Sequence, residues 1–535
     1  TGNEGWVYND NVNDPKIKKW LGEVVGKEGE DLTRHDKWLC MMYPRLKLLQ
    51  KLLAEDGVIF ISIDDNELYN LKKICDDIYG ESCFVGNVAW QRTYSMRNDS
   101  KGLPSEAEYI VVYSKMPNWI PNKLPRTEKM DAAYKNPDND LKGAWQNTTP
   151  YAPGAKTHQG MVYAIQHPFT GEMLYPAPSS CWRYDQQTML GYMNGWCDYE
   201  LRTISDDKER AAVCGINVDD VRKDVKAIML KHSLKQSKEC AESVLKRGQW
   251  PRFYFTKNGM GGIRRKTYLD QVEGRMVTNL WPYSEVGHTD EATKELKNLF
   301  GGNAPFDTPK PTRLLERVIH IASDTDSIIM DFFSGSATTA HAVMKKNLED
   351  GGRRRFVLVQ LPEESRLPEF ENICEIGKER IRRAGRKIKE DAGLTAPADL
   401  DIGFRCLRLD ESNMQPVYYT PEETQQQELF SLVDNVKPDR TPEDLLFQVM
   451  LDLGVLLSSP IESTEIAGKK VFNVADGFLL ACLDHDVTEE TVKAIAQMKP
   501  YYAVFRDSSM ANDSVATNFD QIFETYSPET VRKVL

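Results

Sequence analysis

Residues 327–343 read Ser-Ile-Ile-Met-Asp-Phe-Phe-Ser-Gly-Ser-Ala-Thr-Thr-Ala-His-Ala-Val, and this stretch decides the fold. It starts as a short apolar run, passes through a turn of small residues around Gly335, and continues as an apolar-faced segment from Thr338. A strand, a tight turn and a helix form the repeating unit of a parallel α/β sheet. Ligands of such sheets bind at the carboxyl ends of strands, where small residues let backbone N–H groups approach. The turn therefore predicts a ligand site, with a purely structural turn as the alternative.

The α/β pattern continues on both sides of this stretch. Apolar residues at helical spacing, or in short continuous runs, predict a helix from Pro311, a strand over 356–361, and, near the N-terminus, a helix at 36–53, a strand at 58–63, a helix at 68–78 and a strand at 109–113. In the block that begins at Pro311, the order strand, helix, strand favours parallel pairing with right-handed crossovers. We therefore expect two α/β blocks in one chain.

The segment between these blocks has a different character. Over 117–300, Pro, Gly, Asn and aromatic residues are frequent and strand signals are short, while 201–246 reads as a charged, helical insertion. A loop-rich block between two α/β blocks predicts an inserted recognition domain. From Asp391 to Leu535 the chain is acidic, with 11 Lys and Arg against 25 Asp and Glu. Because an acidic surface repels DNA, this last part is expected to bind protein.

Composition excludes several classes of protein. The 535 residues are 41% hydrophobic and 28% charged with a mean hydropathy of −0.51, which is typical of a soluble protein of several domains. No run of 18 apolar residues occurs, so no membrane span is predicted. The cysteines form no Cys-x-x-Cys pair and the histidines no His-x-x-x-His pair. We therefore expect reduced thiols, a cytoplasmic location and no metal site.

The residues around the turn limit which class of ligand the site is expected to bind. Gly335 is the only glycine of the run, so neither a Walker A loop nor a Gly-x-Gly-x-x-Gly fingerprint is present. Asp331 at the strand end suits a cationic amine, and Gln360 and Glu363 after the next strand suit a ribose diol. An amine and a ribose without a phosphate favour S-adenosylmethionine over a dinucleotide.

The segment 331–343 resembles the cofactor-binding motif of the β-class amino-methyltransferases of DNA, in the form typical of the modification (Mod) subunits of type III restriction–modification systems. Residues 306–311 are similar to the Lys-Pro segment that precedes this motif, and 356–363 to the motif that follows it. Residues 46–65 and 108–115 also fit the family. The resemblance covers about 1–120 and 300–390.

The resemblance implies an α/β fold, namely a Rossmann-like S-adenosylmethionine-dependent methyltransferase sheet with an inserted target-recognition domain and a C-terminal α+β domain. The expected domains are a catalytic half at 1–120, a recognition domain at 121–300, a cofactor-binding half at 301–394 and an acidic association domain at 395–535. Both halves are expected to share one sheet and one pocket. The expected cofactor-binding residues are Lys310, Asp331, Phe332, Phe333, Ser334, Gly335, Ser336, Thr338, Gln360 and Glu363.

A basic stretch in the inserted block predicts the DNA surface. Residues 246–275 hold eight Lys and Arg against Asp270 and Glu273, with aromatic residues between them. Cations suit phosphates and flat rings suit bases, although a basic strand pair with its aromatics in the core is the alternative. Together with a polar loop at 91–103, the predicted DNA-binding residues are Arg92, Arg97, Lys101, Lys246, Arg247, Arg252, Tyr254, Lys257, Arg264, Arg265 and Lys266. The basic run 378–389 is a second candidate, equally well explained as a solvated helix face.

The catalytic tetrad of the resembled family, Asp-Pro-Pro-Tyr, does not occur in this sequence, which contains no Pro-Pro pair. The chain begins Thr1-Gly2-Asn3, like the residues that usually follow the tetrad. We expect the tetrad just upstream of residue 1, with Thr1, Gly2 and Asn3 as the nearest residues. The alternative is a protein that lacks the tetrad and only binds DNA.

The expected function is site-specific methylation of adenine N6 in a base flipped out of duplex DNA, because a paired amino nitrogen is otherwise inaccessible. Alternatives are a catalytically silent recognition subunit, an N4-cytosine methyltransferase, or methylation of RNA or a small amine. No Pro-Cys dipeptide exists, which argues against a cytosine-C5 mechanism with a nucleophilic thiol. The resemblance implies double-stranded DNA, a second copy of the chain and a restriction (Res) subunit as partners.

Overall fold

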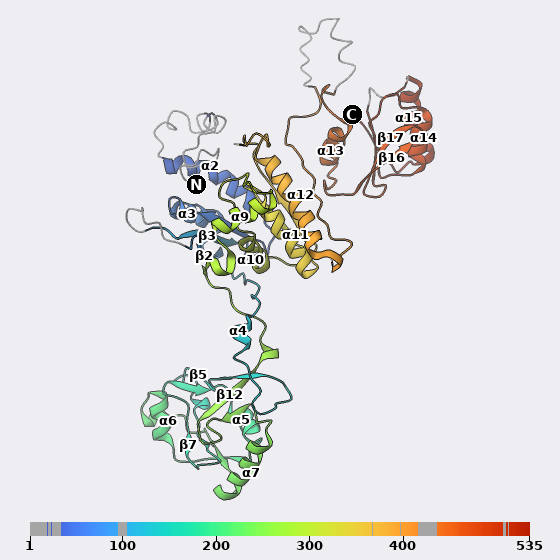
Figure 1. Ribbon diagram of the computed structural model, residues 1–535. Coiled ribbons are helices and arrows are strands. Elements are labelled where there is room, and N and C mark those ends of the chain that lie inside the picture. The colour runs from blue at the N-terminus through green and yellow to red at the C-terminus, as the bar shows by residue number, and fades with distance from the viewer. Residues whose placement is uncertain are drawn as a thin grey trace. The chain divides into compact units, whose positions relative to one another are not determined.

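The computed structural model describes residues 19, 23, 34–94, 104–365, 367–395, 397–415, 436–506, 510–511 and 513–535. The chain divides into two compact units, Thr1–Phe404 and Arg405–Leu535, whose elements are labelled in Figure 1. Within the described part of the chain, no helix is both long and apolar enough to cross a membrane. Thr1, Gly2, Asn3, Arg97 and Lys101 lie outside the described residues.

The first α/β block consists of α2 (Arg34–Leu52), β1 (Val58–Ile63), α3 (Leu68–Tyr79), β2 (Phe84–Gln91) and β3 (Ala107–Ser114). Its sheet has the order β1-β3-β2-β13, with β13 (Leu280–Trp281) contributed by a much later part of the chain. Strands β1, β3 and β2 pair antiparallel, whereas β13 pairs parallel to β2. The apolar stripes of α2 and α3 pack against β1 in one core. The helices and strands predicted at 36–113 are confirmed.

The second α/β block consists of α10 (Thr312–Ala322), β14 (Ile328–Asp331), α11 (Thr338–Asp350), β15 (Arg355–Leu358) and α12 (Ile373–Ala392). Strands β14 and β15 pair parallel, as predicted. They form a sheet of their own, and in the described residues no ladder joins β14 to β1. The structure therefore differs from the single shared sheet that was predicted. The two blocks are joined instead by α10, which packs Leu314 and Ile321 against the first sheet and Ile319 against α11.

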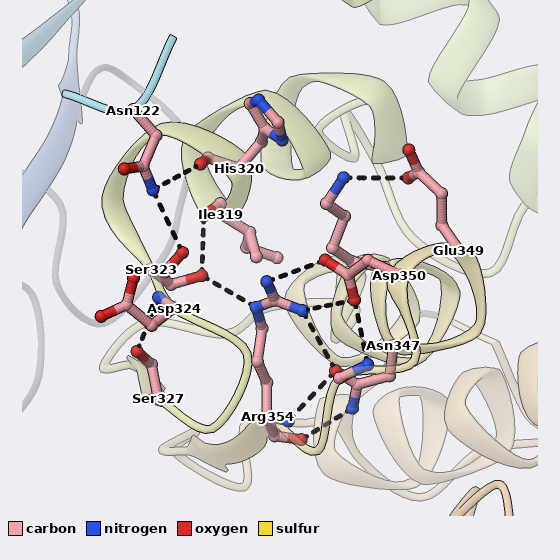
Figure 2. A network of polar contacts seen from close by, with 12 residues as sticks. Asn122, Ile319, His320, Ser323, Asp324, Ser327, Asn347, Glu349, Asp350 and Arg354 are labelled. Carbon is pink, nitrogen blue, oxygen red and sulfur yellow. Dashed lines mark hydrogen bonds and ion pairs between the residues drawn. The ribbon is translucent and has the colours of Figure 1, made fainter. Parts of the chain in front are cut away.

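A polar network around the buried Arg354 stabilises the end of the second block that lies away from the turn at Gly335 (Figure 2). Arg354 donates both Nη atoms to Asp350 at 2.9 Å and its Nε to Ser323 Oγ at 2.9 Å. Asn347 accepts from the Arg354 N–H at 3.1 Å. The network thus ties the ends of α10 and α11 to the start of β15.

The recognition block contains α4 (Glu128–Asp131), β4 (Trp145–Thr148), β5 (Tyr151–Pro153), β6 (Ile165–Gln166), β7 (Met173–Leu174), β8 (Ser180–Trp182), α5 (Gln186–Met193), β9 (Tyr199–Arg202), α6 (Asp207–Cys214), β10 (Ala227–Leu230), α7 (Leu234–Arg247), β11 (Phe253–Phe255) and β12 (Ile263–Tyr268). Its sheets have the orders β7-β6-β10-β9, β11-β12-β4 and β5-β8. The segment 201–246 is therefore not simply helical, because β10 runs through it. Trp182 and Trp196 lie in a shared core.

The chain leaves the α/β part for the recognition block and returns from it at one place. Leu124 and Arg275 exchange two backbone hydrogen bonds of 2.9 Å. Beside them, Asn122 Nδ2 donates to the carbonyl oxygens of His320 at 3.2 Å and Ser323 at 3.4 Å (Figure 2). After β13, the short helix α8 (Tyr283–Val286) and α9 (Thr289–Leu299) lead back to α10.

The second unit is a five-stranded sheet with helices on both faces. It contains α13 (Pro442–Asp452), β16 (Ile461–Ile466), β17 (Lys469–Val474), β18 (Leu479–Cys482), α14 (Glu489–Gln497), β19 (Tyr502–Phe505), α15 (Asp513–Tyr526) and β20 (Val531–Val534). The strand order is β16-β17-β18-β19-β20, antiparallel in the first three and parallel in the last three. Alternate residues of the strands face α13 and the pair α14 and α15, because side chains of a strand alternate between faces.

Candidate functional site

The turn between β14 and α11 has an unusual backbone. Gly335 has φ of +50° and Ala337 has φ of +61° with ψ of +37°, so both lie in the left-handed region. A Cβ atom on Gly335 would lie 3.0 Å from the ring of Phe306. Glycine is therefore required here by its φ and by the close ring, which explains the single glycine of the motif.

Asp331 and Gln360 hold the turn in its conformation through hydrogen bonds. Asp331 accepts hydrogen bonds from Thr339 Oγ1 at 2.5 Å and from the Phe333 N–H at 3.3 Å. Burial raises the pKa of Asp331, and these two hydrogen bonds oppose the shift in part. Gln360 Oε1 accepts from the Gly335 N–H at 2.7 Å, and Ser334 N–H donates to the Val359 carbonyl at 3.1 Å. Asp331 and Gln360, which were predicted to bind a ligand directly, thus hold the backbone of the turn.

The hydroxyls of Ser336 and Thr338 point into the protein. Both side chains are buried, and both hydroxyls accept hydrogen bonds from Arg380 of α12. Their hydroxyls are thus engaged behind the turn, and cofactor binding by these two residues stays a prediction. Arg380 itself was missed. It was hidden in the basic run 378–389, although its place on the buried face of α12, four residues after Ile376, is a signal that could have been used.

A cavity of about 190 Å³ adjoins the turn. Phe306, which lies over Gly335, is part of its wall. The lining residues come from three segments and are Ala304, Pro305, Phe306, Asp307, Glu363, Glu364, Ser365, Leu367, Ile373 and Ile376. Apolar side chains suit a flat ring, and carboxylates accept hydrogen bonds from hydroxyl groups. Of the predicted set only Glu363 lines this cavity. Most of the other lining residues lie in loops, where sequence periodicity carries no signal.

Phe332 and Phe333 connect the turn to the first α/β block. Their ring centroids lie 5.0 Å apart, and both rings pack against the core formed by α2, α3 and β1. They therefore bring the carboxyl end of β14 next to the first block, as the prediction of a common pocket requires, although the strands themselves do not pair.

Lys310 and Arg92 converge on one carboxylate. Lys310 Nζ bonds Glu108 and lies 4.7 Å from the centre of the Trp90 ring, while Arg92 Nη1 bonds Glu108 at 2.9 Å. Burial raises the pKa of Glu108, but the two cations outweigh it and lower the pKa overall. Glu108 is therefore ionised at neutral pH. Lys310, which was predicted to bind cofactor, and Arg92, which was predicted to bind DNA, thus belong to one ion-pair cluster around Glu108.

The predicted DNA surface divides into exposed and buried residues. Lys246, Arg247, Lys257 and Arg264 are exposed, and Arg252 and Arg265 are half-buried. All six lie in or beside α7 and the β11–β12 hairpin.

Lys266 lies in the core of the recognition block. It is fully buried, and its Nζ donates to Asp138 at 2.5 Å, to Asp140 at 2.6 Å and to the Trp250 carbonyl at 2.7 Å. The Tyr254 ring is also buried and stacks on Trp250 at 5.7 Å. The prediction that Lys266 and Tyr254 contact DNA is therefore wrong, and for these two residues the core alternative holds.

His341 is buried at the start of α11. Burial, followed by the nearby cations Arg380, Lys345 and Lys387, lowers its pKa to about 3. The imidazole is therefore neutral at physiological pH.

Comparison with known proteins shows which family this chain is similar to. The family model described as "DNA methylase" matches residues 8–179 and 199–384. The StyLTI Mod subunit of a type III restriction–modification enzyme of Salmonella typhimurium is 31% identical over 78% of this chain and 56% of its own length. The EcoP15I Mod subunit of Escherichia coli is 28% identical over 93% of this chain and 73% of its own. The type II methyltransferase M.KpnI of Klebsiella pneumoniae is 29% identical over 61% and 67%. The match thus spans little more than half of the StyLTI subunit.

Proposed function

The chain belongs to the DNA methylase family, and from this premise we propose that it is the modification subunit of a type III-like restriction–modification system. In this proposal it binds S-adenosylmethionine beside the β14–α11 turn and methylates adenine N6 at specific sites in double-stranded DNA. The observation that carries the proposal is the left-handed glycine turn at the carboxyl end of β14, next to a cavity that combines apolar and acidic side chains.

The chemistry of the cavity fits the cofactor. S-adenosylmethionine supplies a methyl group activated by a sulfonium charge. In the proposal, Glu363 and Asp307 accept hydrogen bonds from the ribose hydroxyls, while Phe306 and Ile376 contact the adenine ring. The turn lies beside the polar end of the cofactor, in a backbone conformation that Asp331 and Gln360 maintain.

The site also suits transfer to a nucleic acid base. Phe332 and Phe333 bring the turn next to the first α/β block, which we assign as the catalytic half at 1–120. The cofactor-binding half is 301–394. In the proposal, the residues of these halves align two bound reactants, which accounts for most of the rate in a displacement that needs no strong base.

The recognition domain, 121–300, is proposed to contact DNA through Lys246, Arg247, Lys257 and Arg264, which are exposed on neighbouring elements. The acidic domain predicted at 395–535, which includes the second unit Arg405–Leu535, is proposed to bind protein. Candidate partners are a second copy of the chain and the restriction subunit named for the relatives' systems.

Two alternatives remain within the same fold. One alternative is a catalytically silent recognition subunit, whose chain would lack Asp-Pro-Pro-Tyr throughout. Cytosine N4 is a second possible target, because it is also an exocyclic amino group. The same experiment separates these possibilities.

The test combines binding with transfer. The 535-residue chain is titrated with S-adenosylmethionine by calorimetry and then incubated with tritiated cofactor and duplex DNA, with RNA as control, followed by nucleoside analysis. N6-methyladenine supports the proposal, and N4-methylcytosine or methylated RNA contradicts it. Cofactor and sequence-specific DNA binding without transfer is expected if the tetrad lies upstream of these 535 residues, so the native N-terminus is sequenced as well. An upstream Asp-Pro-Pro-Tyr supports the enzyme, and its absence identifies the silent subunit. Absence of cofactor binding would refute the assignment of the site.

A further inference from the structure

Arg380 is a fully buried arginine directly behind the glycine turn. Its Nη1 donates to Ser336 Oγ at 2.9 Å and to Thr338 Oγ1 at 2.6 Å. Its Nη2 donates to Thr312 Oγ1 at 3.4 Å, and Glu295 Oε2 lies 3.9 Å away. One guanidinium therefore connects the turn to the start of α10 and, through Glu295, to α9.

The two hydroxyls that Arg380 Nη1 holds flank the strained residue of the turn. Ala337 lies between Ser336 and Thr338 and adopts the left-handed conformation, which disfavours every residue with a Cβ atom. Such a conformation persists only where its surroundings determine it. By bonding the residues on both sides, Arg380 fixes the backbone at the point where it enters α11.

The partners of Arg380 are unusual for a buried cation. Its hydrogen bonds go to three neutral hydroxyls, and its nearest ion-pair partner, Glu295, is beyond hydrogen-bond distance. Glu295 instead accepts from Thr312 Oγ1 at 2.7 Å. Burying a charge with neutral partners costs free energy, and Arg354 at the other end of α11 avoids this cost through its bidentate pair with Asp350. The charged N–H donors of Arg380 behind the turn thus serve to hold the conformation of the turn.

We propose that Arg380 is a positioning residue for the methyl donor, which acts through Ser336 and Thr338 to hold the turn in its binding conformation. This inference rests on the proposed function, because it concerns the same site. It predicts that loss of the guanidinium weakens cofactor binding beyond any effect on stability, and that loss of the two hydroxyls does the same.

Calorimetric titration of the 535-residue chain with S-adenosylmethionine tests the inference, with thermal unfolding recorded for each variant. Arg380→Met is expected to weaken binding about 30-fold or more and Arg380→Lys about 5-fold, because an ammonium can still donate to hydroxyls but without the fork geometry. The matched control is Arg354→Met, another buried arginine contacting α11. It should lower the melting temperature yet keep the affinity within about twofold.

A rescue experiment separates positioning from general damage. Adding Ala337→Gly to Arg380→Met should recover part of the lost affinity, because glycine adopts the left-handed conformation without support. If neither Arg380 variant folds, Ser336→Ala combined with Thr338→Val tests the same contacts and should weaken binding about 10-fold.

The outcomes are distinguishable. Affinity within twofold of the original chain in Arg380→Met, or in the Ser336 and Thr338 double variant, would overturn the inference. Equal loss of affinity in Arg354→Met would also overturn it, since that result indicates general destabilisation. If the unaltered chain does not bind S-adenosylmethionine, the proposed function fails instead.

Discussion

The two ends of the β14–α11–β15 unit each contain a buried arginine, but the arginines are used differently. At the far end, Arg354, just before β15, is neutralised by Asp350 at the end of α11 and joins three elements (Figure 2). At the turn end, Arg380 comes from another helix and bonds hydroxyls that flank a left-handed residue. The first arrangement stabilises packing, whereas the second maintains a backbone shape at additional cost. The comparison shows how one α/β unit separates its stability from its binding site.

The largest expected effect is on cofactor affinity, and it distinguishes Gly335 at the turn end from Gly351 at the far end. Gly335→Val should lower the affinity for S-adenosylmethionine at least about 100-fold, or about 2.7 kcal/mol, because the side chain meets Phe306 and the φ is positive. Gly351→Ala, at a left-handed position with open space around it, should cost about 1 kcal/mol of stability and leave the affinity unchanged. Calorimetry and thermal unfolding measure both. Equal affinities in the two variants would remove the distinction between the ends.

The next effect concerns stability at the far end. Arg354→Met leaves the partly buried carboxylate of Asp350 without its partner and should lower the free energy of unfolding of the first unit by about 2 kcal/mol. Urea unfolding followed by tryptophan fluorescence provides the measurement. A loss below about 0.5 kcal/mol would mean that the network in Figure 2 contributes little to the packing of the helix ends.

A third prediction compares the turn with the recognition domain through their proposed ligands, S-adenosylmethionine and duplex DNA. Asp331→Ala removes the acceptor that fastens the turn, so cofactor affinity should fall about tenfold while duplex binding changes little. Arg264→Ala with Arg265→Ala should weaken duplex binding about tenfold at moderate salt and leave cofactor affinity unchanged. Calorimetry and fluorescence anisotropy measure the two affinities. Equal effects of both variants on both ligands would contradict the division between turn and recognition domain.

The smallest effect is a pH dependence at the far end. Burial raises the pKa of Asp350, but the hydrogen bond and charge of Arg354 outweigh burial, so the net pKa is lowered. A lowered pKa contributes stability above the unfolded value near 4, and this contribution is lost as the pH falls through the folded value. Asp350→Asn should therefore be about 1 kcal/mol less stable than the original chain at pH 7, and the difference should shrink below pH 4. Paired thermal melts across this range measure it, and a constant difference would argue against the pairing.

The sequence predicted the local parts of this architecture well. The strand, turn and helix at 327–346 and the helices and strands at 36–113 follow from hydrophobic periodicity and from a single glycine, which are properties of neighbouring residues. The strand β10 escaped prediction because it is short and lies between two charged helices. Its buried residues form a strand only through pairing with β6 and β9.

The contacts around the predicted site residues could not be read from the sequence. Lys266 looked like part of a basic surface because its partners, Asp138 and Asp140, lie more than 120 residues earlier in the chain. Likewise, nothing near Ser336 and Thr338 in sequence showed that Arg380 would bond their hydroxyls. Charge clusters can be counted along a sequence, but whether a charge is satisfied depends on contacts that only the fold creates.

The paired backbones at Leu124 and Arg275 have a consequence for how this protein can diversify. Because the outgoing and returning chains meet at one place, the distance between the two junctions does not depend on the length or fold of what lies between them. An exchange of the whole intervening block would thus preserve the geometry of the core on both sides. Under the proposed function, new sequence preferences would then arise by replacement of one module, with the rest of the protein unchanged.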